Sequence, residues 1–143
     1  MRRWGIRVFE TFEHTADLGL RVRADDLASL YSDAASGLFS IIVANQNEIR
    51  PVKQRRLAID GAQPDLLLFD WLNELLYLYD TEQLLLRRFE VETSAEGLTA
   101  DVRGEPIDMS RHHLEHEVKA ITYHGLLVRP DGEGWLAEVI VDI

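Results

Sequence analysis

The sequence contains no cysteine among its 143 residues. Disulfide bonds, thiol catalysis and cysteine-based zinc sites are therefore excluded. Apolar runs are short, and none approaches the roughly 18 residues that a membrane-spanning helix needs. Residues 1–5 are basic, but no long apolar segment follows them, so we expect no signal peptide. The default expectation is a cytoplasmic protein without a membrane partner.

Positive charge is also scarce. Asp and Glu total 25 against 15 Lys and Arg, which gives a formal net charge of −10. Proteins that grip a phosphate backbone on their own carry a basic face, so we expect no strong direct nucleic-acid binding. The charge suits cations or a basic protein surface as partners. Only Lys53 and Lys119 are lysines; each either fills a role that arginine cannot or has survived by chance.

Several catalytic signatures are missing. The sequence has no Gly-x-Ser-x-Gly turn, no phosphate-binding loop and no dinucleotide fingerprint, which disfavours an autonomous nucleotide-using enzyme. His112 and His116 do have the His-x-x-x-His spacing of zinc proteases. That segment is short and polar, however, and Glu115 is not where such a motif needs its glutamate. We do not interpret it as a protease site.

What is present is sufficient for one globular domain, residues 1–143. Helical spacing of apolar residues predicts an amphipathic helix at 26–44 and a largely apolar central helix at 66–79, entered through Pro64. Residues 104–108 are expected to break the sheet. Alternating apolar residues predict strands at 8–12, 18–23, 53–60, 84–92, 98–103, 117–123 continuing into 126–129, and 135–143.

Short turns between consecutive strands favour antiparallel pairing. The predicted class is therefore α+β, with a mostly antiparallel sheet and two main helices gathered toward one face or end of it. On the central helix, the carboxylates at 70, 74, 80 and 82 resemble a metal cluster in composition. Their spacing along one stripe favours a solvated face instead.

A polar corner separates the first two predicted strands. Residues 13–17 place two carboxylates, an imidazole and a hydroxyl side by side, including His14 and Asp17. A corner can carry side chains that do not face the core, so chemistry could reside here. Alternatively, Thr15 and Asp17 only hydrogen-bond the backbone of a local turn.

The last residues are a second candidate. The final strand leads into Asp142 and Ile143, so the Asp142 side chain would lie beside the terminal carboxylate. Two adjacent carboxylates repel one another unless something positive joins them. The candidates are a divalent cation such as Ca²⁺ or Mg²⁺, the side chain of Lys119, or plain solvent around a frayed end.

At these residues the sequence resembles the archease family, along the whole chain. The resemblance is carried by five motifs in order: Phe-Glu-His-Thr-Ala-Asp at 12–17, Asp-Trp-Leu-Asn-Glu-Leu-Leu-Tyr at 70–77, Gly-Glu at 104–105, Glu-Val-Lys-Ala-Ile-Thr-Tyr-His at 117–124, and Val-Asp-Ile at 141–143. Five motifs in the right order are specific, whereas any one of them alone is not.

The resemblance implies a non-enzymatic protein cofactor of the RtcB-type RNA ligase, which seals tRNA exon halves. In that family the cofactor promotes transfer of GMP to the ligase histidine and supports multiple turnover; some members also modulate a tRNA methyltransferase as chaperones. It further implies a divalent cation, taken to be calcium with magnesium as the second choice, on Asp17, Asp142 and Ile143. Lys119 is implied in activation, and we group His14, Glu117 and His112 with it.

These implications turn two separate candidates into one. We expect folding to bring Asp17 to the chain end, where the carboxylates and Lys119 form a single charged patch that docks on the ligase. Two alternatives remain open. One is a small metal-dependent phosphohydrolase using Asp17, His14 and Asp142, since paired carboxylates on a cation can activate water. The other is a folding chaperone with an inert structural ion.

Overall fold

The computed structural model of the protein describes residues 8–14 and 17–143. Within them the chain forms, in order, β1 (Phe9–His14), β2 (Asp17–Ala24), α1 (Leu27–Ile42), the short 3-10 helix η1 (Gln46–Glu48), β3 (Lys53–Asp60), α2 (Pro64–Glu82), β4 (Leu84–Ser94), β5 (Gly97–Pro106), β6 (Ala120–Ile121), β7 (Leu127–Asp131) and β8 (Gly134–Asp142). The α+β class with two main helices is confirmed.

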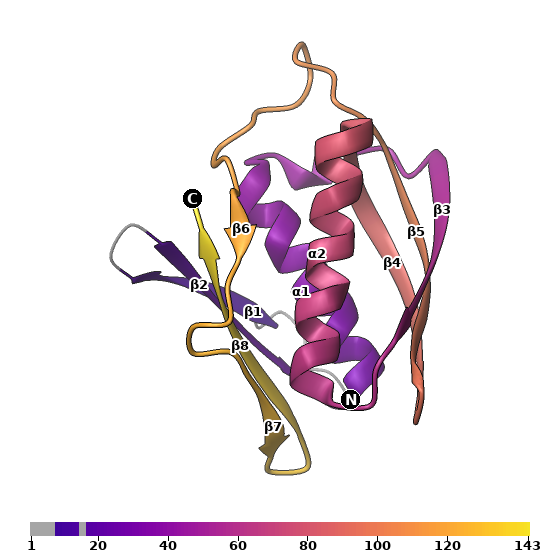
Figure 1. Ribbon diagram of the computed structural model, residues 1–143. Coiled ribbons are helices and arrows are strands. Elements are labelled where there is room, and N and C mark those ends of the chain that lie inside the picture. The colour runs from indigo at the N-terminus through magenta and orange to yellow at the C-terminus, as the bar shows by residue number, and fades with distance from the viewer. Residues whose placement is uncertain (1–7, 15–16) are drawn as a thin grey trace.

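The described strands form two antiparallel sheets, where the sequence analysis expects one. The larger has the order β1-β2-β8-β6, with β7 also paired to β8, and the smaller has the order β3-β5-β4. Figure 1 shows both helices between the sheets, which agrees with their contacts to strands of each. Both sheets therefore have one face toward the helices and one face toward solvent.

Helix α1 holds β2 in place. It begins after Asp26, whose Oδ1 accepts a hydrogen bond of 2.7 Å from the Ser29 N–H, as expected for an N-cap. Gly37 lets the helix lie close to β2, because a Cβ at this position would be 2.5 Å from Leu20 Cδ1. The fully buried Leu20 thus anchors β2 against the helix.

Helix α2 is the central helix that the sequence predicts. Pro64 lies in its first turn, and Trp71 is fully buried, with its Nε1 donating to the Tyr31 carbonyl at 2.9 Å. The exposed stripe carries Asp70, Glu74 and Tyr77, which confirms a solvated face. None of the described helices is long and apolar enough to cross a membrane.

The prediction that residues 104–108 break the sheet is wrong for the first three of them. Gly104 pairs with Lys53 on one side and Leu86 on the other, and β5 continues to Pro106. A Cβ on Gly104 would be 1.8 Å from the Leu85 carbonyl oxygen, so glycine is what permits this close pairing. The strand ends at Pro106, which cannot donate to a ladder.

The predicted strand at 117–123 is also mostly wrong, since only Ala120–Ile121 pair with β8. The preceding segment is diverted to the end of α1. The N–H groups of Glu115 and His116 donate to the carbonyls of Ile42 and Ile41, at 2.8 and 3.2 Å. These contacts satisfy carbonyls that a helix end leaves without intrahelical partners.

Candidate functional site

The pairing of β2 with β8 brings the first residue of β2 beside the end of the last strand. In this antiparallel register Asp17 lies directly opposite Asp142. On its other side, Asp142 lies opposite Ala120 of β6. Directly opposite residues in such a pair have Cβ atoms roughly 4.5–5.5 Å apart. The prediction that folding carries Asp17 to the chain end is therefore confirmed.

Strand alternation places both aspartates on the face of the larger sheet that points away from the helices. In β2 the buried Leu20 and Val22 point toward the helices, so Asp17 belongs to the opposite face. In β8 the buried Val139 and Val141 do the same for Asp142. Both aspartates are half-buried. The pattern of the core residues thus fixes the position of the two carboxylates.

Two carboxylates facing each other across a strand pair destabilise it unless a positive charge joins them. Arg21 is one of the arginines on the same face, and it donates to Glu138 Oε2 at 2.5 Å and to Glu10 Oε1 at 3.0 Å. These hydrogen bonds, first with Glu138 and then with Glu10, raise the pKa of Arg21. It also lies four residues from Asp17, roughly 13 Å along the strand. The positive charge of Arg21 is therefore engaged by Glu138 and Glu10.

Lys119 is bonded to Asp142 through the backbone. Its N–H donates to the Asp142 carbonyl oxygen at 2.8 Å, and its side chain is exposed. The neighbouring Val118 and the nearby Ile121 are buried, at 3% and 5% exposure, and hold this segment in place. We call Asp17, Lys119, Asp142 and Ile143 the strand-end patch.

The other residues grouped with activation lie around or away from this patch. His14 is the backbone partner of Asp17 in the β1–β2 pair, but its side chain, like Thr15 and Ala16, lies outside the described residues. Glu117 is exposed. It lies near enough to α2 to help raise the pKa of Tyr79, after burial and Asp80.

His112 is in the interior, at 1% exposure. Its Nδ1 accepts a hydrogen bond of 2.9 Å from the Asp108 N–H, so the proton of the neutral ring is on Nε2. Nε2 in turn lies 3.0 Å from Glu105 Oε2, to which it donates. Both ring nitrogens are therefore engaged within the protein. In this arrangement His112 positions a loop and does not reach a partner directly.

Glu105 is the acceptor at the centre of that loop. It is 7% exposed, and it also accepts from the Arg50 N–H at 2.7 Å and from the Arg111 guanidinium. Burial by itself would raise the pKa of Glu105. The hydrogen bonds from Arg50, Arg111 and His112 outweigh burial, and the pKa is lowered. The sequence analysis missed this cluster, although Gly104-Glu105 and the basic run at 111–113 were visible.

The donor set of the strand-end patch fits a hard divalent cation. It offers the carboxylates of Asp17 and Asp142 and a main-chain oxygen of Ile143, and oxygen ligands are those that Ca²⁺ and Mg²⁺ prefer. Among the described residues, no three acidic or histidine side chains gather around one point that could hold a metal. A cation here would thus need main-chain oxygen or water as well.

A cavity of about 410 Å³ lies on the inner side of the same sheet, between β1, β2 and the end of α1. Leu18, the neighbour of Asp17, and His116 are among its lining residues. Its polar residues Ser40 and Gln46 already donate to the carbonyls of Gly37 and Ser36. The cavity is therefore a feature separate from the patch on the solvent face.

Comparison with known proteins covers nearly the whole chain. The model of the archease protein family matches residues 9–143. Protein archease from Pyrococcus abyssi is 39% identical over 149 residues, covering 100% of both chains. Protein archease from Sulfurisphaera tokodaii is 34% identical over 137 residues, covering 94% of this chain and 98% of that protein.

Solved structures agree with these relatives. The solution structure of Methanobacterium thermoautotrophicum protein 1598 has a TM-score of 0.87 and 32% identity, covering 96% of this chain and 100% of that one. The crystal structure of an archease from Thermotoga maritima, described as a "possible chaperone", has a TM-score of 0.62 and 19% identity. It covers 94% of this chain and 96% of its own, and it supports the fold alone.

Proposed function

This chain belongs to the archease family, and from that membership and the strand-end patch we propose a non-enzymatic activator of an RtcB-type tRNA-splicing RNA ligase. In this proposal the protein works in the cytoplasm and promotes guanylylation and multiple turnover of the ligase. The observation that supports it best is the pairing of Asp17 with Asp142, with Lys119 bonded alongside.

Asp17, Asp142 and a main-chain oxygen of Ile143 would hold the divalent cation. We favour Ca²⁺ over Mg²⁺, because Ca²⁺ accepts irregular oxygen coordination whereas Mg²⁺ demands a near-ideal octahedron. A bound cation would supply positive charge that organises phosphates at the mouth of the ligase site. The two strands hold both aspartates rigidly, because the pairing of β2 with β8 is fixed by the buried residues of both strands.

Lys119 would make the contact to the partner. Its exposed ammonium is a compact charge that can meet a phosphate or a ligase carboxylate. Its backbone is fixed by the 2.8 Å bond to Asp142, so the side chain starts from a defined point. Exposed Glu117, two residues before Lys119, would extend the contact. His14, the backbone partner of Asp17, would extend it on the other side of the patch. His112 would act indirectly, by positioning the loop that leads to Lys119.

The test is guanylylation of the ligase with and without this protein. Asp17→Asn and Lys119→Ala should each lower the maximal stimulation, by at least about tenfold if one transition-state contact of about 1.4 kcal/mol is lost. Glu133→Gln, in the exposed β7–β8 turn, is the matched control and should stimulate fully. Full stimulation by both patch variants would refute the patch as the working end.

A chaperone role is the second candidate, because the Thermotoga maritima archease is described as a "possible chaperone". The partner would then be a folding client, such as a tRNA methyltransferase, and the ion would be structural. Chelation followed by refolding separates the two proposals. A chaperone with an inert ion should lose thermal stability but keep any effect on the ligase, whereas the activator should lose that effect.

A further inference from the structure

The basic residues of this acidic protein are gathered at one end of the smaller sheet. Eight of the 15 lie in the segments 50–56, 87–88, 103 and 111. By contrast, α2 carries five acidic residues between 65 and 82 and no Lys or Arg. Charge is therefore segregated in the fold, even though the protein as a whole has a net charge of −10.

The register places two of the basic residues directly opposite one another and a third one step away along the next strand. Gln54 of β3 lies opposite Arg103 of β5, which in turn lies opposite Arg88 of β4. Lys53 is one step along β3, so its side chain leaves the sheet from the face opposite to that of Arg88 and Arg103, and Arg87 is the extra residue where the β4–β5 register shifts between Leu86 and Arg88. Such a bulge re-aims side chains at a sheet end.

The preceding loop adds one more cation at this end. The Arg50 N–H is bound to the carboxylate of Glu105 in β5, which leaves its exposed side chain beside the sheet. We call Arg50, Lys53, Arg87, Arg88 and Arg103 the basic edge. With neighbouring strands about 4.8 Å apart, Arg88 and Arg103 lie side by side on one face, and Lys53 lies at the same end of the sheet on its other face.

The acidic groups nearest the basic edge are already neutralised. Asp101 is paired with Arg103 at 3.2 Å and with Arg56 at 3.8 Å, and Glu82 with Arg55 at 2.5 Å. Glu105 is buried under its own donors. Acidic side chains resume beyond the edge, with Glu48 in η1 and Glu90 opposite Asp101.

Several cations of the basic edge have no such partner. Across the described residues, no carboxylate lies within ion-pair distance of the side chains of Arg50, Lys53 or Arg88, and all three are exposed. Arg88 also faces Arg103 directly, and like charges at opposite positions destabilise a sheet. A chain with ten more acids than bases could have neutralised these positions, yet does not.

We propose that the basic edge binds the phosphodiester backbone of RNA. The cations are spread along three strands and a loop, which fits a chain of phosphates better than a single anion. Contacts from these cations to phosphates carry no sequence information, so the binding would be weak, salt-sensitive and indifferent to sequence. This goes beyond the proposed function, because it gives the protein its own contact with RNA, independent of the ligase.

The test uses the protein alone with a short fluorescent single-stranded RNA of mixed sequence, followed by anisotropy at about 50 mM salt. The unaltered protein should bind with a dissociation constant of roughly 1–100 μM, the non-specific range. Arg88→Glu should weaken binding about tenfold. It should also flatten the log–log salt dependence by about 0.7 for the lost phosphate contact.

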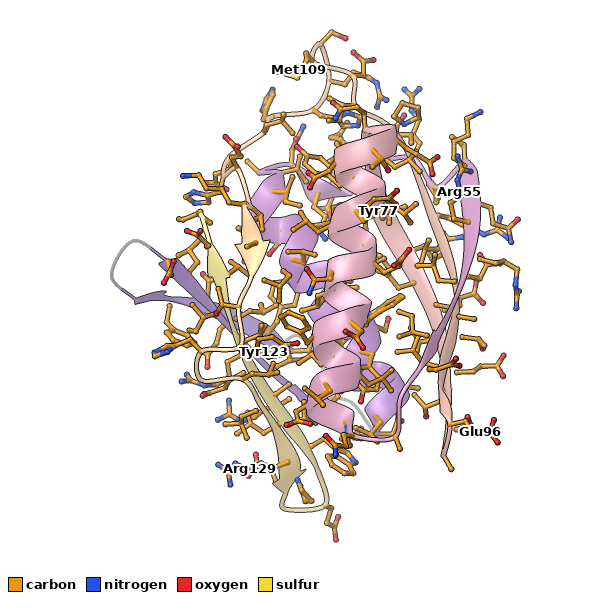
Figure 2. All side chains as sticks on the ribbon, viewed as in Figure 1. Arg55, Tyr77, Glu96, Met109, Tyr123 and Arg129 are labelled. Atoms are coloured by element: carbon orange, nitrogen blue, oxygen red, sulfur yellow. The ribbon has the colours of Figure 1, made fainter. Side chains whose placement is uncertain are left out.

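The matched control is Arg129→Glu, which changes the net charge by the same amount. Arg129 is exposed on β7, and Figure 2 shows it far from Arg55 of β3, which lies beside the basic edge. The control should bind RNA as the unaltered protein does. Three results would overturn the proposal. These are equal weakening by both variants, competition by polyglutamate as strong as that by unlabelled RNA, and no binding by the unaltered protein at low salt.

Discussion

At the scale of single residues, Glu105 shows how a buried charge holds the loop that follows β5. It accepts from Arg50, Arg111 and His112 at once, and Arg111 also binds the Asp108 carboxylate at 3.2 Å. Two segments distant from one another, around 50 and at 105–112, therefore meet at one carboxylate. The segment that follows leads to Lys119, so the position of that lysine depends on this buried cluster.

We predict that Glu105→Gln lowers the free energy of unfolding by about 2–3 kcal/mol at pH 7, because hydrogen bonds to a charged acceptor are weakened and Arg111 loses its partner. Urea unfolding of both proteins measures the difference. Glu90→Gln is the control, since Glu90 is exposed. A loss at Glu105 no larger than that of the control would contradict the role given to this carboxylate.

The same carboxylate predicts a pH dependence with a definite sign. Its pKa in the folded protein is below its ordinary value of 4.5, so its contribution is fully present above that value. The contribution is lost as the pH falls through the lower folded-state pKa. The stability difference between the native protein and Glu105→Gln should therefore shrink under acid conditions. A difference that stays constant from pH 7 to pH 3 would refute this sign.

Residues of the strand-end patch could be predicted from the sequence, whereas the Glu105 cluster could not. Asp17 begins a strand with clear apolar alternation, whereas β8 ends in the continuous apolar run 139–141, so the meeting of Asp17 with Asp142 was predicted from the family resemblance. His112 was grouped with activation through the family resemblance, as a member of the histidine-rich stretch 111–116. Its burial depends on Glu105 and on the Asp108 backbone, which no local pattern reveals.

At the scale of elements, the helices and the long strands follow from periodicity. The strand Lys53–Asp60, the first helix and the central helix were all predicted. The prediction of a strand at 117–123 was mostly wrong, because an alternating side-chain pattern does not indicate which strand the segment pairs with. Here β8 ends at Asp142, and the main chain before Val118 bonds to α1 instead.

We predict that Gly104→Ala is strongly destabilising, by about 3 kcal/mol or more, since overpacking against rigid main chain is costly. The added Cβ would lie 1.8 Å from the Leu85 carbonyl oxygen, so β4 and β5 would have to separate. Thermal unfolding measures the loss. The effect should reach the basic edge as well, because Arg103 and Arg88 depend on this pairing.

Gly132→Ala provides the comparison for that substitution. Gly132 has a φ of 63° but no atom within 4 Å of an added Cβ, so only backbone strain of about 1–2 kcal/mol is expected. Equal losses for the two variants would mean that crowding between β4 and β5 is not what requires glycine at position 104.

At the scale of the whole molecule, the two charged surfaces lie on different sheets. The strand-end patch belongs to the larger sheet and the basic edge to the smaller one, with the helices between them (Figure 1). The proposals for the two surfaces are therefore independent, and variants of one should leave the other intact. A protein with both could contact the ligase through one sheet and RNA through the other.

The pairing of Asp17 with Asp142 also predicts how a cation affects stability. Its ligands come from β2 and from the end of β8, so binding would favour the folded chain over the unfolded one. At a Ca²⁺ concentration about 100 times the dissociation constant, the gain is about 2.7 kcal/mol, or roughly 5–10 °C in melting temperature. Melting curves with Ca²⁺, Mg²⁺ and chelator measure this shift.

Asp142→Asn tests the same prediction, because the variant should respond differently in the absence and in the presence of the cation. Without any cation the variant should melt at the same temperature as the unaltered protein or slightly higher, because the repulsion between facing carboxylates is removed. With Ca²⁺ it should gain little, whereas Glu133→Gln, in the exposed β7–β8 turn, should keep the full gain. If Asp142→Asn gained as much as the unaltered protein, the cation would have to bind elsewhere, and the facing carboxylates would need another explanation.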